Sequence, residues 1–152
     1  MDYLEKTKFS LNEIKQHLGQ NQNKSVLVES YLVQYLLVCL YSEIENTLVK
    51  IIRNRLHFAG DQKLQNFVYN TNEAMIKRAK TGDIRTFVEK FGCDKETCFQ
   101  SITAKELGVY GSALANRHAV SHAEGVSLTL EEFEQALIAA EKILVTVESI
   151  IK

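Results

Sequence analysis

The sequence predicts an all-α fold: one bundle of five or six helices with a long central second helix. None of the 152 residues is proline, and because proline interrupts helices, its absence favours long helices joined by short connections. Apolar residues recur every three or four positions along most of the chain, the period of a helix face. Two Thr-x-x-Glu sequences, at Thr103–Glu106 and Thr129–Glu132, have the pattern of the capping box that starts a helix. No repeat, linker or low-complexity tract divides the chain, so residues 1–152 are expected to form a single domain.

The first helix is expected over about residues 2–18, and Gly19 suits its C-terminal cap. Its apolar positions are Leu4, Leu11, Ile14 and Leu18. A polar loop then leads to Ser25, which is expected to cap the start of the second helix.

The second helix is expected over about residues 26–58, before Gly60. One apolar stripe along it comprises Val28, Leu32, Tyr35, Cys39, Leu48 and Ile52, and Tyr31, Leu36, Leu37 and Leu40 widen that stripe. Because its middle is apolar nearly all round, this helix should be the centre of the bundle. We assign the tyrosines at 31, 35 and 41 to the core and an interface rather than to a platform for base stacking.

The second half of the chain should contain shorter helices before a long final one. Residues 61–80 are more polar, and the Asn70-Thr-Asn72 cluster is expected to break them into two short helices. Another short helix is expected over residues 83–91, before Gly92. The two capping boxes start the last two helices. The last one carries a narrow packing seam of Leu130, Phe133, Leu137, Ala140, Leu144, Val147 and Ile151.

Composition restricts the class of function. The net charge is −1, which argues against non-specific coating of nucleic acid but leaves room for a locally positive cleft. The N-terminus has no apolar signal core and no apolar run reaches the ~18 residues of a membrane span, so we expect a cytoplasmic protein without a membrane partner. Of the three cysteines, Cys39 should be a core residue, while Cys93 and Cys98 lack two further zinc ligands at matching spacing. We expect no metal and no cofactor.

The residues most suited to catalysis lie between the two capping boxes, where an arginine and two of the four histidines fall within six residues. Arg117 offers a planar, permanently charged fork that matches phosphate oxygens. His122 titrates near neutral pH and so suits acid–base catalysis at a ribose hydroxyl. Five positions correspond to roughly 140° around a helix, so the two side chains converge only if the helix unwinds or a second subunit supplies one of them.

Two alternatives stay open for this segment. His118 and His122 have the spacing of a two-histidine metal site, but the segment lacks the glutamate of His-Glu-x-x-His and no third ligand is identifiable. The cluster also fits basic residues placed at a helix C-terminus, where the helix dipole favours cations.

The segment Arg117-His-Ala-Val-Ser-His122 resembles the HEPN signature: an arginine, a polar residue, then a histidine four to six positions after the arginine. Its place late in the penultimate long helix also fits. The apolar second helix around residues 44–52, and the short helix ending at residues 91–92, look like the RiboL-PSP branch of that family. Related sequences often have glycine directly after the histidine, whereas Ala123-Glu124 precede Gly125 in this chain.

The resemblance implies a HEPN-like bundle that pairs as a homodimer along the motif helices, with one composite cleft. It implies a metal-independent endoribonuclease that leaves a cyclic phosphate and a 5′-hydroxyl. Arg117 would position the phosphate, His122 would be the acid–base, and His118 would support both. Further supporting candidates are Asn116, Ser121 and Glu45, the last of which either orients Arg117 or occupies an ordinary exposed position. A toxin or defence effector, with an antitoxin or inhibitor protein as partner, is the role that the resemblance suggests.

Other readings remain. One is a non-catalytic HEPN bundle that binds nucleotide or a partner protein, and another is a structural dimerisation or antitoxin-like module. Arg53-Asn-Arg-Leu-His57 resembles the motif with a spacing one residue short, and it ends the long helix, where basic residues are common. We interpret it either as a structural patch or as a patch that contacts phosphate and contributes to RNA binding.

Overall fold

A computed structural model describes residues 3–20, 25–121 and 127–152. These residues form six α-helices and no strand, which confirms the predicted helical bundle with a long second helix. The helices are α1 (Glu5–Gln20), α2 (Val26–His57), α3 (Gln62–Ile76), α4 (Thr81–Glu89), α5 (Ala104–Ser121) and α6 (Leu130–Ile151). The expected bounds are close to these, apart from α3 and the starts of α1 and α4.

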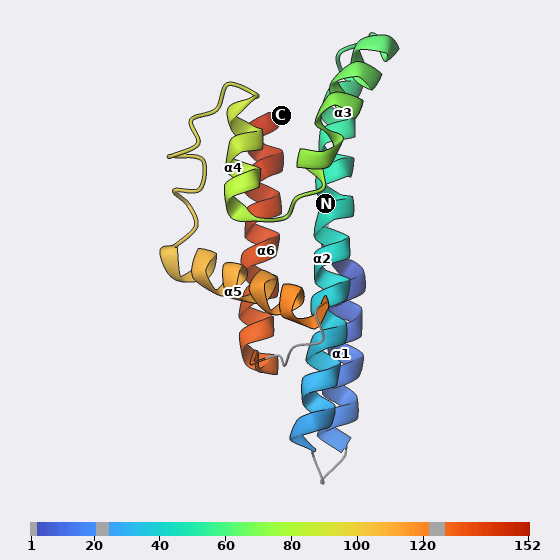
Figure 1. Ribbon diagram of the computed structural model, residues 1–152, viewed down its shortest axis with the longest axis vertical. Helices are drawn as coiled ribbons and strands as arrows, with labels where there is room; N and C mark the ends of the chain where they lie inside the picture. The colour runs from blue at the N-terminus through green and yellow to red at the C-terminus, as the bar shows by residue number, and fades with distance from the viewer. Residues whose placement is uncertain (1–2, 21–24, 122–126) are drawn as a thin grey trace.

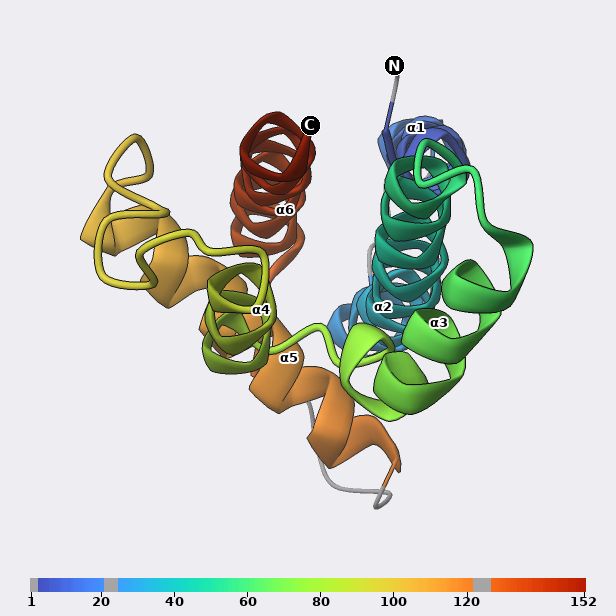
Figure 2. The same ribbon diagram turned by 90° about the horizontal axis from the view of Figure 1, so that it is seen from above.

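The long helices α2 and α6 form the frame of the bundle (Figure 1). Helix α1 lies along α2 as an antiparallel hairpin, and α5 crosses α6 and reaches α2 with its C-terminal end. Seen from above, α1 and α3 cover different sides of α2 (Figure 2). The residues at the end of α5 therefore lie beside the middle of α2.

Tyr110 joins α5 to the connection between α3 and α4. Its side chain is fully buried, and its hydroxyl donates a hydrogen bond of 2.5 Å to the backbone carbonyl of Ala79. Burial raises the pKa of the Tyr110 phenol, and the electrostatic effect of Tyr41 raises it further. The buried bond satisfies a polar group that would otherwise be costly in the core. It also links α5 to the connection between α3 and α4.

Both predicted capping boxes are present. The Thr103 hydroxyl accepts from the backbone N–H of Glu106 at 3.2 Å, and the Glu106 carboxylate accepts from the Thr103 backbone N–H at 2.9 Å. Thr129 and Glu132 make the same pair of bonds at 3.2 and 2.8 Å. These local bonds satisfy N–H groups that have no partner inside the helix. Helices α5 and α6 therefore begin where the sequence predicts.

The prediction that the Asn70-Thr-Asn72 cluster breaks a helix is wrong, because α3 runs through it. The Thr71 hydroxyl donates to the carbonyl of Phe67 at 2.7 Å, and the Asn72 amide donates to the carbonyl of Val68 at 2.8 Å. Both bonds reach four residues back along the helix, so these side chains bond to the helix backbone instead of competing with it.

The predicted buried stripe of α2 is correct in part: Leu36, Leu37, Leu40, Leu48 and Ile52 are buried as predicted, but Val28, Tyr31 and Tyr35 are exposed. The buried residues are Val33, Leu36, Leu37, Leu40, Ile44, Leu48, Ile51 and Ile52. Val28, Tyr31, Tyr35 and Val38, which we call the α2 apolar stripe, are exposed, the two tyrosines by 58% and 54%. Cys39 is half-buried rather than a core residue. Because the first half of α2 is apolar on nearly every side, periodicity alone does not determine which side faces the core.

The seam predicted for α6 is confirmed: Phe133, Leu137, Ala140, Leu144, Val147 and Ile151 are buried and Leu130 is half-buried. The seam is wider than predicted, since Ala136, Ala139 and Ile143 are also buried. This face packs against α2, α4 and α5.

Helix α2 is long and apolar enough to cross a membrane when length and composition alone are considered. A core helix of a bundle meets the same two conditions. In this structure α2 packs against α1, α3, α5 and α6.

The Glu43 carboxylate caps the first turn of α1 from the neighbouring helix α2. It accepts from the backbone N–H groups of Lys6 at 3.1 Å and Thr7 at 2.9 Å, and from the Thr7 hydroxyl at 2.8 Å. Thr7 is fully buried, so this carboxylate satisfies a buried hydroxyl as well as helix-end N–H groups.

Candidate active site

Arg117 lies near the C-terminal end of α5 and is half-buried against α2. Its guanidinium carbon lies 4.1 Å from the centre of the Tyr41 ring. A cation over an aromatic face is attracted by the negative charge density of the ring. In the described part of the chain no carboxylate forms an ion pair with Arg117, so its charge is anchored but not neutralised.

The Tyr41 hydroxyl in turn interacts with the carboxylate of Glu45, one helical turn later on α2. Burial raises the pKa of the Tyr41 phenol, and the Glu45 carboxylate, which hydrogen-bonds with the hydroxyl, raises it further, while Arg117 opposes part of the rise. Arg117, Tyr41 and Glu45 therefore form one cluster between α5 and α2. Glu45 is half-buried and reaches Arg117 through the tyrosine.

Sequence reasoning missed Tyr41, which it assigned to a core and interface series. A signal existed, because Tyr41 and Glu45 are four residues apart and so share one face of α2. The contact with Arg117 joins residues 76 positions apart in the chain, and such a pairing is set by how α5 crosses α2.

Asn116 connects α5 to the start of α6. Its amide nitrogen donates to the carbonyl of Ser112 at 3.0 Å, and its amide oxygen accepts from the backbone N–H of Ser127 at 3.1 Å and from the Ser127 hydroxyl at 3.4 Å. Residues 122–126 are thus flanked on one side by α5 and on the other by a residue bonded to Asn116. Asn116 therefore links the last turns of α5 to Ser127.

The other predicted site residues are only partly placed. His118 follows Arg117 on α5 and is exposed, which puts it about 100° further around the helix than Arg117. Ser121 is the last residue of α5, but its side chain lies outside the described residues, as does the whole of His122. The alternative of a metal held by His118 and His122 falls outside them for the same reason.

No group of three or more His, Cys, Asp or Glu side chains in the described ranges has the arrangement of a metal site. Cys93 and Cys98 are half-buried and pack against the core. The Cys93 thiol donates toward the carbonyl of Ile150 at 3.8 Å, and the Cys98 thiol donates toward the carbonyl of Lys95 at 3.2 Å.

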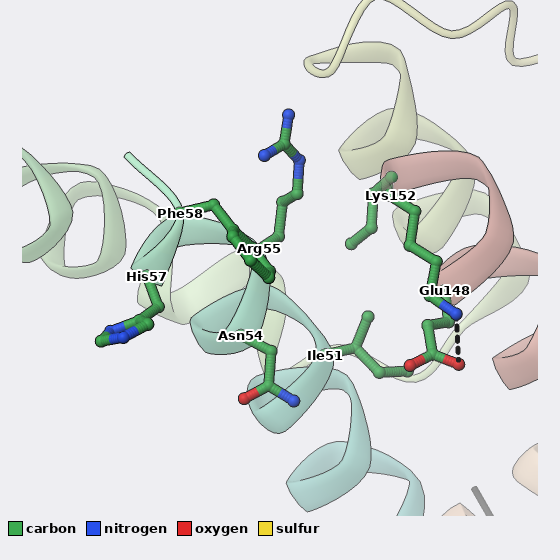
Figure 3. Close-up of a pocket in the computed structure, with 8 residues that line it drawn as sticks. Ile51, Asn54, Arg55, His57, Phe58, Glu148 and Lys152 are labelled. Carbon is green, nitrogen blue, oxygen red and sulfur yellow. Dashed lines mark ion pairs between the residues drawn. The ribbon is translucent and has the colours of Figure 1, made fainter. Parts of the chain in front are cut away.

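The second arginine–histidine sequence, at the C-terminal end of α2, lines two grooves. The first is a hollow of about 330 Å³ between the ends of α2 and α6, bordered by Ile51, Asn54, Arg55, Phe58, Glu148 and Lys152 among others. In Figure 3, Glu148 and Lys152 form an ion pair of 3.7 Å, and the Arg55 and His57 side chains point in different directions. These two side chains therefore do not converge on one point.

The second groove, which we call the α2–α3 groove, has a volume of about 470 Å³. It lies between the end of α2 and the first turns of α3, and its lining residues are Arg53, Asn54, Leu56, His57, Gln62, Gln65, Asn66 and Tyr69. Arg53 and His57 thus share one side of α2, one helical turn apart.

Comparison with known proteins does not identify this chain: no family model matches it, and no similar curated protein or solved structure was found. The assignment of function therefore depends on the residues and their geometry.

Proposed function

We propose that this chain is a metal-independent endoribonuclease of the HEPN type, with Arg117 and His122 as its catalytic pair. The observation that carries the proposal is the state of Arg117: half-buried, held over the Tyr41 ring and without an ion pair in the described residues. The fold adds support, because Arg117 lies late in the penultimate helix of an all-α bundle, where the resemblance expects it.

Stacking on Tyr41 suits an arginine that binds phosphate. The aromatic ring contacts the flat face of the guanidinium, so the N–H donors around its edge stay available for oxygen acceptors. A guanidinium in a partly desolvated position attracts a phosphate more strongly than one in bulk water. Arg117 is thus suited to stabilising the negative charge that develops on phosphorus during cleavage.

The proposed reaction is transesterification within the RNA strand. His122 takes the proton of a ribose 2′-hydroxyl, the 2′-oxygen forms a bond to phosphorus, and the bond between phosphorus and the 5′-oxygen breaks. A protonated imidazole in the same cleft returns a proton to the leaving 5′-oxygen. The products are a 2′,3′-cyclic phosphate and a 5′-hydroxyl, and no metal or cofactor is needed.

A homodimer is part of the proposal. The α2 apolar stripe leaves Tyr31, Tyr35 and two valines exposed on consecutive turns of α2 that lead to Tyr41. A contiguous exposed apolar surface is typical of an interaction site. A second copy covering this stripe would bring its own α2 and α5 next to the Arg117 cluster, as a composite cleft requires.

We place the enzyme in the cytoplasm as a toxin or defence effector, with RNA as substrate and an antitoxin or inhibitor as a further partner. This role follows from the resemblance alone. The rival functions are a non-catalytic HEPN bundle that binds nucleotide or a partner protein, and a structural dimerisation module.

Cleavage assays separate these functions. Wild type, Arg117→Ala and His122→Ala are incubated with RNA in EDTA, and product ends are identified by mass spectrometry. We expect wild type to produce cyclic phosphate and 5′-hydroxyl ends, and both variants to lose most activity. Lys105→Ala is the control, because Lys105 is an exposed basic residue at the start of the same helix, α5. Intact RNA with wild type, or equal cleavage by both catalytic variants, would overturn the proposal.

A further inference from the structure

The α2–α3 groove is polar and, on its described lining, contains no aspartate or glutamate. Four of its lining residues carry carboxamides, namely Asn54, Gln62, Gln65 and Asn66. A carboxamide both donates and accepts hydrogen bonds, as the edges of nucleobases do. The Gln62 amide donates to the Asn66 oxygen at 3.1 Å, which orients both groups on the surface of α3.

Arg53 and Tyr69 form a stacked pair across this groove. The Arg53 guanidinium carbon lies 4.4 Å from the centre of the Tyr69 ring, and the two residues come from different helices. Unstacked nucleobases bind to aromatic rings and to the flat faces of arginine side chains. The pair therefore gives the groove two flat surfaces as well as a positive charge.

The chain segment that contains the groove is the positive part of a sequence that is slightly acidic overall. Residues 50–90 hold nine of the eighteen lysines and arginines but four of the nineteen acidic residues. Lys77 and Arg78 are paired with Glu73 and Asp83, whereas Arg53, Arg55 and Lys63 have no ion pair with any described residue. This local excess favours a polyanion at a site where net charge alone would not.

We propose that the α2–α3 groove binds a nucleotide of single-stranded RNA, with its base on the Arg53–Tyr69 pair and its edge on the carboxamides. Arg53 follows Tyr41 by twelve residues on α2, which corresponds to ~18 Å along the helix axis. The groove is thus separate from the Arg117 cluster but lies on the same helix. The binding of RNA at this groove does not depend on the proposed ribonuclease function. Only the further statement that the bound strand is also the substrate rests on it.

Fluorescence anisotropy with a labelled 2′-O-methyl RNA 12-mer tests this, since that strand lacks the 2′-hydroxyl needed for cleavage. We expect Arg53→Gln and Tyr69→Leu each to weaken binding about 5- to 100-fold, the usual effect of losing one stacking residue. Tyr69→Phe keeps the ring and should bind as wild type does. Lys105→Gln removes an exposed charge from the start of α5 and should change binding less than about twofold. Circular dichroism checks that each variant is folded.

Three results would overturn the inference: wild-type affinity in both Arg53→Gln and Tyr69→Leu, equal weakening by Lys105→Gln, or equally tight binding of polyglutamate. A duplex of the same sequence should bind more weakly, because its bases are not available for stacking. Arg117→Ala should retain groove binding. If wild type binds through the groove but cleaves no RNA, the ribonuclease proposal fails and this inference stands. If wild type cleaves RNA and the groove variants bind RNA normally, this inference fails and the ribonuclease proposal stands.

Discussion

The guanidinium of Arg117 lies 4.1 Å from the centre of the Tyr41 ring, so the end of α5 is fixed to α2 by a charged side chain on an aromatic face. An arginine on a flexible four-bond stem would otherwise sample many rotamers. The ring reduces that freedom without consuming the N–H donors around the edge of the guanidinium. Tyr41 is therefore a positioning residue for the proposed phosphate-binding group.

Two substitutions of Tyr41 should distinguish the contribution of its ring from that of its hydroxyl. Tyr41→Leu removes the cation–π contact, worth about 0.5–2 kcal/mol, and should lower kcat/KM for RNA cleavage about 2- to 30-fold. Tyr41→Phe keeps the ring, loses the bond with Glu45, and should retain most of the activity. Steady-state kinetics on a fluorogenic RNA measures both. Greater damage from Tyr41→Phe than from Tyr41→Leu would assign the role to the hydroxyl instead.

Asn116→Ala should reduce both stability and cleavage. It removes the acceptor of the Ser127 bonds, and the loss of such a hydrogen bond costs about 1 kcal/mol. The same change should lower kcat, because the residues between α5 and Ser127 include His122. Urea denaturation and single-turnover kinetics check the two effects. Asn46→Ala is the matched control, since Asn46 is exposed on α2. An unchanged kcat with reduced stability would limit Asn116 to a structural role.

Glu43→Ala should destabilise the fold by about 1–3 kcal/mol, because it leaves the buried Thr7 hydroxyl and two N–H groups of α1 without their acceptor. Chemical denaturation gives this free energy of unfolding. Glu13→Ala is the comparison, since Glu13 is exposed on α1 and should change stability by less than about 0.5 kcal/mol. Equal effects of the two substitutions would contradict the capping role of Glu43.

Lowering the pH should remove the stability that the Glu106 carboxylate contributes at the start of α5. The Lys142 ammonium and the bonds from Thr103 lower the pKa of Glu106 from 4.5 to about 2. A carboxylate with a depressed folded-state pKa adds stability above its unfolded pKa and loses it as the pH falls through the folded value. The Tm advantage of wild type over Glu106→Gln should therefore be full above about pH 5 and disappear between pH 4.5 and 2. Thermal melts across this range test it, and a constant difference would count against this assignment.

A charge on the α2 apolar stripe should prevent dimerisation. Tyr35→Glu places a carboxylate where the proposed partner packs, and burying it unpaired would be costly. Analytical ultracentrifugation should show a dimer for wild type and a monomer for Tyr35→Glu, which should also lose RNA cleavage. Phe9→Glu is the control, because Phe9 is also an exposed aromatic residue, 67% exposed, but belongs to α1 and not to α2. A monomeric wild type that cleaves RNA would remove the composite cleft from the proposal.

The sequence predicted best where a feature depends on residues close together in the chain. The boxes at Thr103 and Thr129 each involve residues three positions apart, and α6 has polar residues on its outer face that fix the phase of its seam. The first half of α2 lacks such residues, so the prediction placed Val28, Tyr31 and Tyr35 on its buried side, although they are exposed. Thr71 and Asn72 were read as helix breakers because the same side chains have two bonding options, inside or outside a helix.

The candidate site was predictable in part. The motif indicated Arg117, and Glu45 was weighed as a neighbour from another helix. Tyr41 and the bonds of Asn116 with Ser127 depend on how α5 crosses α2 and how the chain returns to α6, and no short-range pattern contains that information. The prediction for His122 stays a prediction, since His122 lies outside the described residues.

The buried bond from Tyr110 to Ala79 limits how this protein can be re-engineered or diversified. Tyr110 is two helical turns before Arg117 on the same helix, and its acceptor belongs to the connection after α3. Replacing α3 and its connection with a shorter loop would strand the phenol hydroxyl in the core, at a cost of about 1–3 kcal/mol. Helix α5, which carries the motif, therefore cannot be moved into another bundle without the segment that supplies its hydrogen-bond acceptor. A chimaera should exchange α3, its connection and α5 together.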